Sequence, residues 1–78
     1  MQSLNTHGGG ATELPEVERR IAESNALIEH QRKLIERLGD EGYDIISAQI
    51  VFDSLCISLS LHLQDRYRLR AMLNVKAA

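Results

Sequence analysis

Several residue types that stabilise small folds are scarce in this sequence. Its 78 residues include no Trp, one Phe, one Pro and one Cys. A single Cys excludes a disulfide within one chain, and a domain of this size without disulfides or metals has a marginal core. One unpaired Cys also indicates a reducing, cytoplasmic compartment, and the N-terminus lacks the basic start and apolar stretch of a secretory signal.

An excess of charge of either sign and a long apolar run are also lacking. With 9 basic and 11 acidic residues, the net charge of -2 does not indicate nucleic acid or an anionic membrane as the main partner. No uninterrupted apolar stretch is longer than that of Ile50-Val51-Phe52. Since a spanning helix needs about 20 predominantly apolar residues, we expect no transmembrane helix and no membrane partner.

The first half of the chain predicts a tail followed by one helix. Residues 1–13 contain three consecutive glycines and few apolar side chains, so we expect a flexible tail. Over residues 14–38 the apolar side chains recur at intervals of 3, 4 and 7, which is typical of an amphipathic helix. We expect Thr12 to cap this helix, Pro15 to lie in its first turn and Gly39 to follow its last residue.

The second half predicts a turn over residues 39–43 and a helix over about 44–74. Asp44 offers a carboxylate to cap that helix, and neither Gly nor Pro occurs after Gly42. Between Leu55 and Leu63 apolar residues alternate with polar ones, which is the period of a half-buried strand. The uninterrupted segment is far too long for an ordinary strand, so its length favours a helix.

Heptad patterns in the two helices predict how they pair. A short turn forces them antiparallel, and the a positions of one helix then face the d positions of the other. The predicted fold is all-α, an antiparallel two-helix hairpin resembling a coiled coil, with the basic end of helix two beside Glu13, Glu16 and Glu18. The main residues of this hairpin seam are Ile21, Ile28, Ile35, Phe52, Leu55, Leu59 and His62.

The second helix has more apolar surface than the seam uses. On its far side, Ile46, Ile50, Ile57 and Leu61 form a separate row, which we call the far-side stripe. A single thin helix cannot cover both faces, so we expect a homodimer packed as a four-helix bundle, or a larger helical protein partner, with the stripe as the interface. The alternative is a monomer whose stripe stays in contact with water.

Candidate chemical groups point away from an enzyme. His62 in the seam is either a pH-sensitive group or a structural residue hydrogen-bonded to Ser24 or Asn25. Glu29 and His30 are adjacent and point in different directions, and no His or Cys pair has the spacing of metal ligands. Cys56 has no basic neighbour in sequence and is expected to be buried and inert. We therefore expect no catalytic residues, no cofactor and no metal.

These observations favour a small, non-enzymatic, cytoplasmic interaction module or regulator that acts through the apolar face of its second helix. The alternative is a nucleic-acid-associated accessory protein that uses the basic end of that helix. Its residues Arg66, Arg68 and Arg70 are two apart, so they do not share one helical face.

Four short patterns carry a resemblance to known proteins. They are Glu18-Arg19-Arg20-Ile21-Ala22, Ile28-x-x-Gln31-Arg32-x-x-Ile35-x-x-Leu38, Gly42-Tyr43-Asp44-x-x-x-Ala48 and His62-x-x-x-Arg66-x-x-Leu69. Over about residues 16–73 the chain resembles small uncharacterised two-helix proteins of proteobacteria. The resemblance implies an antiparallel hairpin and transfers no catalytic residue; the apolar segment 55–63 and the Gly-rich start depart from it.

Overall fold

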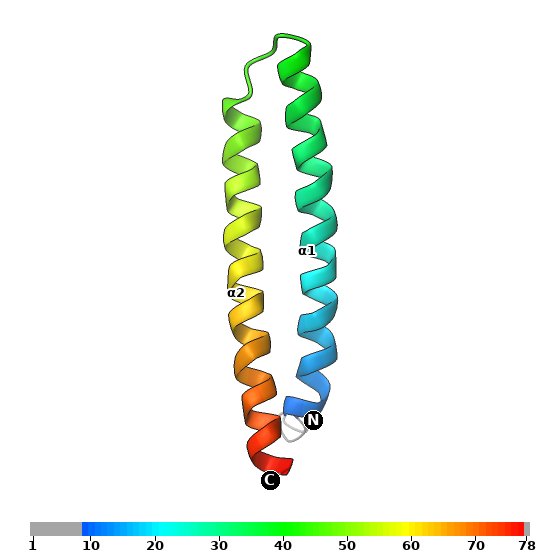
Figure 1. Cartoon of the computed structure of the whole chain (residues 1–78), viewed down its shortest axis with the longest axis vertical. Helices are drawn as coiled ribbons and strands as arrows, with labels where there is room; N and C mark the ends of the chain where they lie inside the picture. Colours follow the sequence, from blue (N-terminus) through cyan, green and yellow to red (C-terminus); the bar gives the residue numbers. More distant parts are fainter. Residues whose placement is uncertain (1–8, 78) are drawn as a thin grey trace, which may run out of the picture.

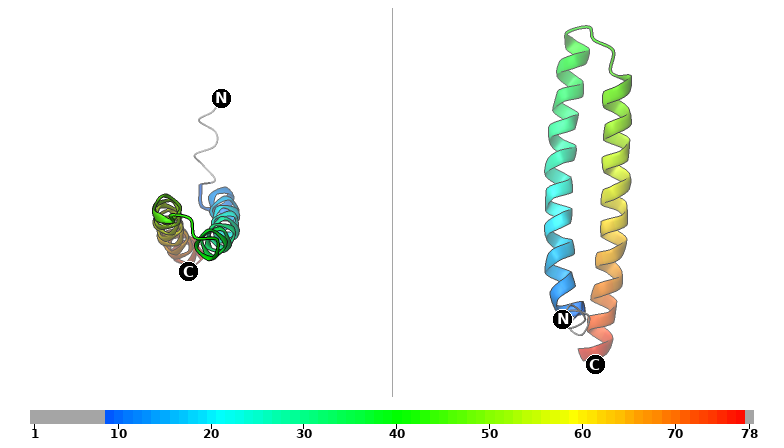
Figure 2. Two further views of the ribbon diagram at one scale, coloured as in Figure 1. Left: turned by 90° about the horizontal axis from the view of Figure 1, so that it is seen from above. Right: turned by 180° about the vertical axis from the view of Figure 1, so that it is seen from behind.

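The protein is a long hairpin of two antiparallel helices. The computed structural model describes residues 9–77, and side chains over residues 13–75. Helix α1 spans Gly9–Asp40 and helix α2 spans Ile46–Ala77, and they lie side by side along their length (Figure 1). The views from above and behind show that residues 9–77 form these two helices, packed side by side, and the turn between them (Figure 2). The predicted all-α hairpin is confirmed, and its extents are 55 × 30 × 15 Å.

Helix α1 begins before the expected start at residue 14. It already includes residues 9–13 of the predicted tail, while residues 1–8 lie outside the described part of the chain. The placements of Thr12 as a cap and of Pro15 in the first turn are therefore wrong, since both lie inside the helix. An interior proline has no N–H for the carbonyl four residues earlier and its ring crowds that carbonyl, yet α1 extends on both sides of Pro15.

The end of α1 is a glycine motif that sequence spacing placed three positions too early. Gly42, with φ of 85°, is the left-handed residue, whereas Gly39 is helical. The Gly42 N–H donates to the Gly39 carbonyl at 3.0 Å, and the Tyr43 N–H donates to the Leu38 carbonyl at 2.9 Å. These two bonds form a Schellman motif, which satisfies carbonyls that the end of the helix would otherwise leave unpaired.

The start of α2 uses the predicted carboxylate. The N–H of Ile46, the first helical residue, donates to Oδ1 of Asp44 at 2.9 Å. The first bond of the helix follows, from the Gln49 N–H to the Ile45 carbonyl at 2.8 Å. The alternating segment 55–63 is helical, as its length predicted, and α2 ends at Ala77 rather than near residue 74.

The core is a thin strip between the helices. In the described chain its buried apolar side chains are Val17, Ile21, Ala48 and Leu69, of which Leu69 is fully buried. The a and d positions of the two heptad patterns are all buried or half-buried; they are residues 14, 17, 21, 24, 28, 31, 35 and 38 in α1, residue 45 just before α2, and residues 48, 52, 55, 59, 62, 66, 69 and 73 in α2. The amide of Gln31 crosses between the helices and donates to the Ala48 carbonyl at 2.9 Å. The heptad spacing pairs Gln31 with Phe52, one turn further along α2, so the buried face agrees with the prediction and this contact lies one turn from the predicted register.

Candidate functional site

The far-side stripe lies on the surface of α2. Ile46, Ile50, Ile57 and Leu61 retain 64, 61, 64 and 59% exposure. They occupy the side of α2 that is turned away from the seam, so α1 does not cover them. Exposed apolar side chains are common one at a time, but an aligned row along one helix is typical of an interaction surface.

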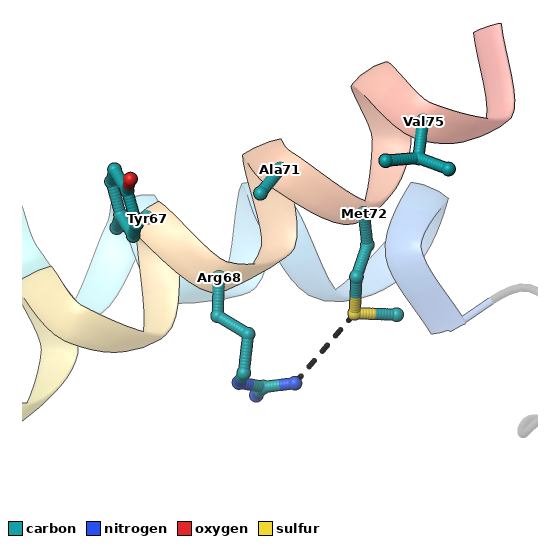
Figure 3. A pocket seen from close by; sticks show the side chains of 5 residues that line it. All are labelled: Tyr67, Arg68, Ala71, Met72 and Val75. Atoms are coloured by element: carbon teal, nitrogen blue, oxygen red, sulfur yellow. Dashed lines mark hydrogen bonds between the residues drawn. The ribbon is translucent and has the colours of Figure 1, made fainter. Parts of the chain in front are cut away.

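A second group of side chains extends the apolar surface toward the end of α2. This C-terminal patch consists of Tyr67, Arg68, Ala71, Met72 and Val75, and it forms a shallow, almost entirely apolar depression. Figure 3 shows Tyr67, Ala71 and Val75 along one side of the helix, while Nη1 of Arg68 lies 3.8 Å from Sδ of Met72. The sequence-based prediction omitted this patch.

The patch continues the far-side stripe around the helix. From Leu61, residues 64, 68, 71 and 75 follow at intervals of 3 or 4, which keeps them on one face. The same interval rule that defined the stripe therefore predicts the patch, but Gln64 and Arg68 interrupt its apolar character. Together the stripe and the patch give α2 a nearly full-length apolar outer face.

The predicted seam residues lie between the helices. Ile21 is buried, and Ile28, Ile35, Phe52, Leu55, Leu59 and His62 are half-buried. In the part of the chain with described side chains, the side-chain hydrogen bonds that cross between helices are Gln31 to Ala48 and Arg70 to Glu18. The expected hydrogen bond from His62 to Ser24 or Asn25 is not among them, so nothing in these contacts links His62 to its neighbours on α1.

The exposed side of α1 differs from that of α2 because it is covered by ion pairs. Arg19 pairs with Glu16 and with Glu23, the latter at 2.8 Å, and the charge of Glu16 followed by that of Glu23 raises the pKa of Arg19. Further along α1, Arg32 pairs with Glu29 and with Glu36. Pairs at these spacings lie on a solvated helix surface.

The ion pairs of Arg32 with Glu29 and Glu36 also shift pKa values. The hydrogen bond from Arg32 lowers the pKa of Glu29, against the opposing effect of desolvation. The same bond, followed by the charges of Glu29 and Glu36, raises the pKa of Arg32. These groups are fully exposed, so the shifts report local pairing on a wet surface rather than a buried chemical site.

The basic end of α2 is largely neutralised. Arg68 pairs with Asp65, one turn earlier on α2, and Arg70 pairs with Glu18 of α1 at 2.8 Å. The latter contact confirms the expectation that this end of α2 lies beside the acidic start of α1. Arg66 is half-buried in the seam. The three arginines therefore do not form a single outward-facing cationic row.

Groups with potential chemistry are dispersed in this structure. Among the described residues, no three His, Cys, Asp or Glu side chains lie close enough to hold a metal ion. The free Cys56 is half-buried rather than fully buried. The described side chains therefore offer an apolar surface for binding rather than a clustered reactive centre.

Helix α2 meets the length and composition of a membrane-spanning helix. Among the described residues, Ile46–Val75 qualifies because an 18-residue window within it has a mean hydropathy of 1.5. The exclusion drawn from the lack of a long apolar run is therefore too strong, because Ser and Gln interrupt the apolar runs without lowering the average enough. Length and composition alone do not assign α2 to a membrane.

No protein-family model matches the chain, and no curated protein or solved structure is significantly similar to it.

Proposed function

We propose that the protein is a non-enzymatic interaction module of the cytoplasm that forms a homodimer through the outer face of α2. Two hairpins packed this way make a four-helix bundle in which the second helices are central. The observation that carries this proposal is the contrast between the few buried apolar side chains of the described chain and a far-side stripe that remains about 60% exposed.

The size of the hydrophobic gain supports a dimer that uses the whole outer face. Burying an Ile or Leu side chain completely yields about 1.5–3 kcal/mol, so the exposed part of each stripe residue offers roughly 1–2 kcal/mol. Four residues in two copies then offer roughly 8–16 kcal/mol, against roughly 4–15 kcal/mol for the entropy lost on association. The stripe alone is therefore marginal, and the C-terminal patch has to contribute.

The exposed side of α1 favours a protein partner over a lipid bilayer. In the hairpin, α1 lies along α2, so a bilayer around α2 would also surround the paired charges at Glu16, Arg19, Glu29 and Arg32. Charged side chains at the centre of a bilayer cost several kcal/mol each. A second copy covers the outer face of α2 and leaves those charges in water.

The paired arginines also favour a protein partner over nucleic acid. A protein binds nucleic acid by placing cationic side chains against the phosphates, which releases the small counterions held there. Arg68 and Arg70 lie beside Asp65 and Glu18, whose negative charges offset the positive charge that would attract a phosphate backbone. A salt-dependent gel shift tests this alternative, and binding that weakens steeply with salt would support it.

The test of the proposal is the oligomeric state of two matched variants. Sedimentation at micromolar concentration should give twice the chain mass of 8.8 kDa for the wild type. Ile50→Glu with Ile57→Glu places two charges on the far-side stripe and should give the monomer mass. Ala22→Glu with Ala26→Glu places two charges on exposed positions of α1 and should remain dimeric.

Circular dichroism of each variant checks that the helices persist. A wild type that stays monomeric, or a stripe variant that sediments like the wild type while remaining helical, would refute the proposal. Flotation with anionic vesicles provides a second readout. Binding of the wild type to vesicles as a monomer would assign the stripe to a lipid surface instead.

A further inference from the structure

The outer face of α2 carries two opposite charges at equal distances from its middle. Asp53 lies between Ile50 and Ile57 of the far-side stripe, and Arg68 lies between Leu61 and the end of the C-terminal patch. Both are exposed. The midpoint of this pair falls between residues 60 and 61, which is also the midpoint of Ile46 and Val75.

We infer, on the basis of the proposed homodimer, that the two α2 helices pack antiparallel with Asp53 of each copy opposite Arg68 of the second copy. The two-fold axis passes between Ser60 and Leu61. The same register places Ile46 opposite Val75 and Ile50 opposite Ala71. Ile46 and Ile50 of each copy then cover the end of the C-terminal patch of the other, while Ile57 and Leu61 lie nearer the axis, opposite Gln64 and Ser60. The outer face is therefore self-complementary about this axis.

The charges select this orientation over a parallel one. In a parallel dimer of the same register, Asp53 would face Asp53 and Arg68 would face Arg68, and like charges in contact oppose association. Antiparallel packing replaces both contacts with oppositely charged pairs. It also opposes the dipoles of the two central helices, which is favourable.

Both side chains are able to make the contact. Among the described residues Asp53 forms no ion pair, so its carboxylate is not committed to a neighbour in the same chain. Arg68 uses Nη2 for Asp65, and its guanidinium has five N–H donors in total. Its remaining donors allow a second carboxylate to bind without loss of the first.

Charge exchange tests the orientation. Asp53→Arg and Arg68→Asp, each alone, place two like-charged contacts in the antiparallel dimer and should raise its dissociation constant at least about tenfold. An equimolar mixture of the two variants should form a heterodimer, because every contact in it is again oppositely charged. The double variant Asp53→Arg with Arg68→Asp should recover homodimerisation for the same reason.

A parallel dimer gives a different pattern in this experiment. In a parallel dimer, each single variant would place like charges in contact at both positions, as the wild type does. A mixture of the two variants would form oppositely charged pairs in the parallel register too, so a positional readout is needed. In a Cys56→Ser background, Ile46→Cys and Val75→Cys are introduced into separate chains, one of them carrying a tag that changes its mobility. Antiparallel packing should give the mixed disulfide on mild oxidation, and parallel packing should give the Ile46→Cys homodisulfide.

The outcomes separate the orientation from the proposed function. Predominant mixed disulfide together with recovery by the double variant supports the inference. A predominant Ile46→Cys homodisulfide in a protein that sediments as a dimer overturns the antiparallel register and leaves the proposed function intact. A wild type that is monomeric by sedimentation overturns both. Ala22→Cys, at an exposed position of α1, measures the background of random collision.

Discussion

The two glycines near the turn should respond to alanine in opposite directions. Gly42 has φ of 85°, a conformation that costs an L-residue roughly 1–2 kcal/mol. A Cβ at this position would meet no atom within 4 Å, so the cost is conformational and not steric. Alanine also restricts the unfolded chain, which returns roughly 0.4–1 kcal/mol. Gly42→Ala should therefore destabilise the hairpin by about 1 kcal/mol.

Gly39 lies inside α1, where alanine is the better helix former by about 1 kcal/mol. A Cβ there would lie 4.0 Å from Cγ2 of Ile45, which is an ordinary van der Waals contact. Gly39→Ala should therefore stabilise the protein by about 1 kcal/mol. The two substitutions add the same methyl group, so the difference between their effects on the unfolding free energy reports the backbone conformation at the two positions.

Thermal unfolding followed by far-ultraviolet circular dichroism measures this difference. One kcal/mol shifts the midpoint by about 4–8 °C in a domain of this size, so the two variants should differ by roughly 8–16 °C. All samples need the same concentration, because the midpoint of an oligomer depends on it. A Gly42→Ala variant as stable as Gly39→Ala would refute the assignment of Gly42 as the left-handed residue. Gly42→Asn should lower the midpoint less than Gly42→Ala does, because Asn tolerates that conformation.

Three further substitutions test individual contacts. Gln31→Ala removes the side-chain bond to the Ala48 carbonyl and should cost about 0.5–1.5 kcal/mol in urea unfolding, whereas an unchanged midpoint would mean that water replaces the bond without loss. Asp44→Ala removes the acceptor at the start of α2 and should cost about 1 kcal/mol by the same assay, with Asp44→Asn retaining most of the stability. Arg32 lowers the pKa of Glu29, so the stability that ionised Glu29 contributes is present above its unfolded-state pKa and is lost as the pH falls through its folded-state pKa. The difference in unfolding free energy between the wild type and Glu29→Gln should therefore vanish in acid. A difference that grows in acid would contradict the pairing.

The seam was predictable from the sequence because many residues specify it together. Heptad spacing on both sides of a short turn fixes one register, and a shift of either helix would expose several apolar side chains at once. Ile21 and Leu69, which occupy an a and a d position, are both buried. The cost of an error in register is several kcal/mol, so the pattern is a reliable guide.

The helix ends were less predictable because each depends on small local differences. Gly39 and Gly42 both satisfy a rule for the end of a helix, and only the pair of backbone bonds around Leu38 and Tyr43 distinguishes them. At the other end, Pro15 is compatible with a first turn and also with a helix interior that loses one bond. The spacing of apolar residues does not decide between these two placements of a single proline.

The candidate surface was predicted only in part. The far-side stripe was recognisable because its members are all Ile or Leu, whereas the C-terminal patch mixes Ala71 and Met72 with Tyr67 and Arg68. A search along α2 for uniformly apolar residues misses this patch because it includes the charged Arg68. The contacts of that arginine with Asp65 and Met72, which require side-chain geometry, show that its charged group lies beside an apolar surface.

The Schellman turn at Gly42 brings the start of α1 and the end of α2 to one end of the hairpin (Figure 1). In the proposed antiparallel dimer the second copy would be inverted, so each pole would carry the turn of one copy and the helix ends of the other. Anything attached to the two copies near residue 9 or residue 77 would then be held at opposite poles of a rod about as long as the 55 Å hairpin. The bundle would act as a rigid spacer of defined length between two attached groups.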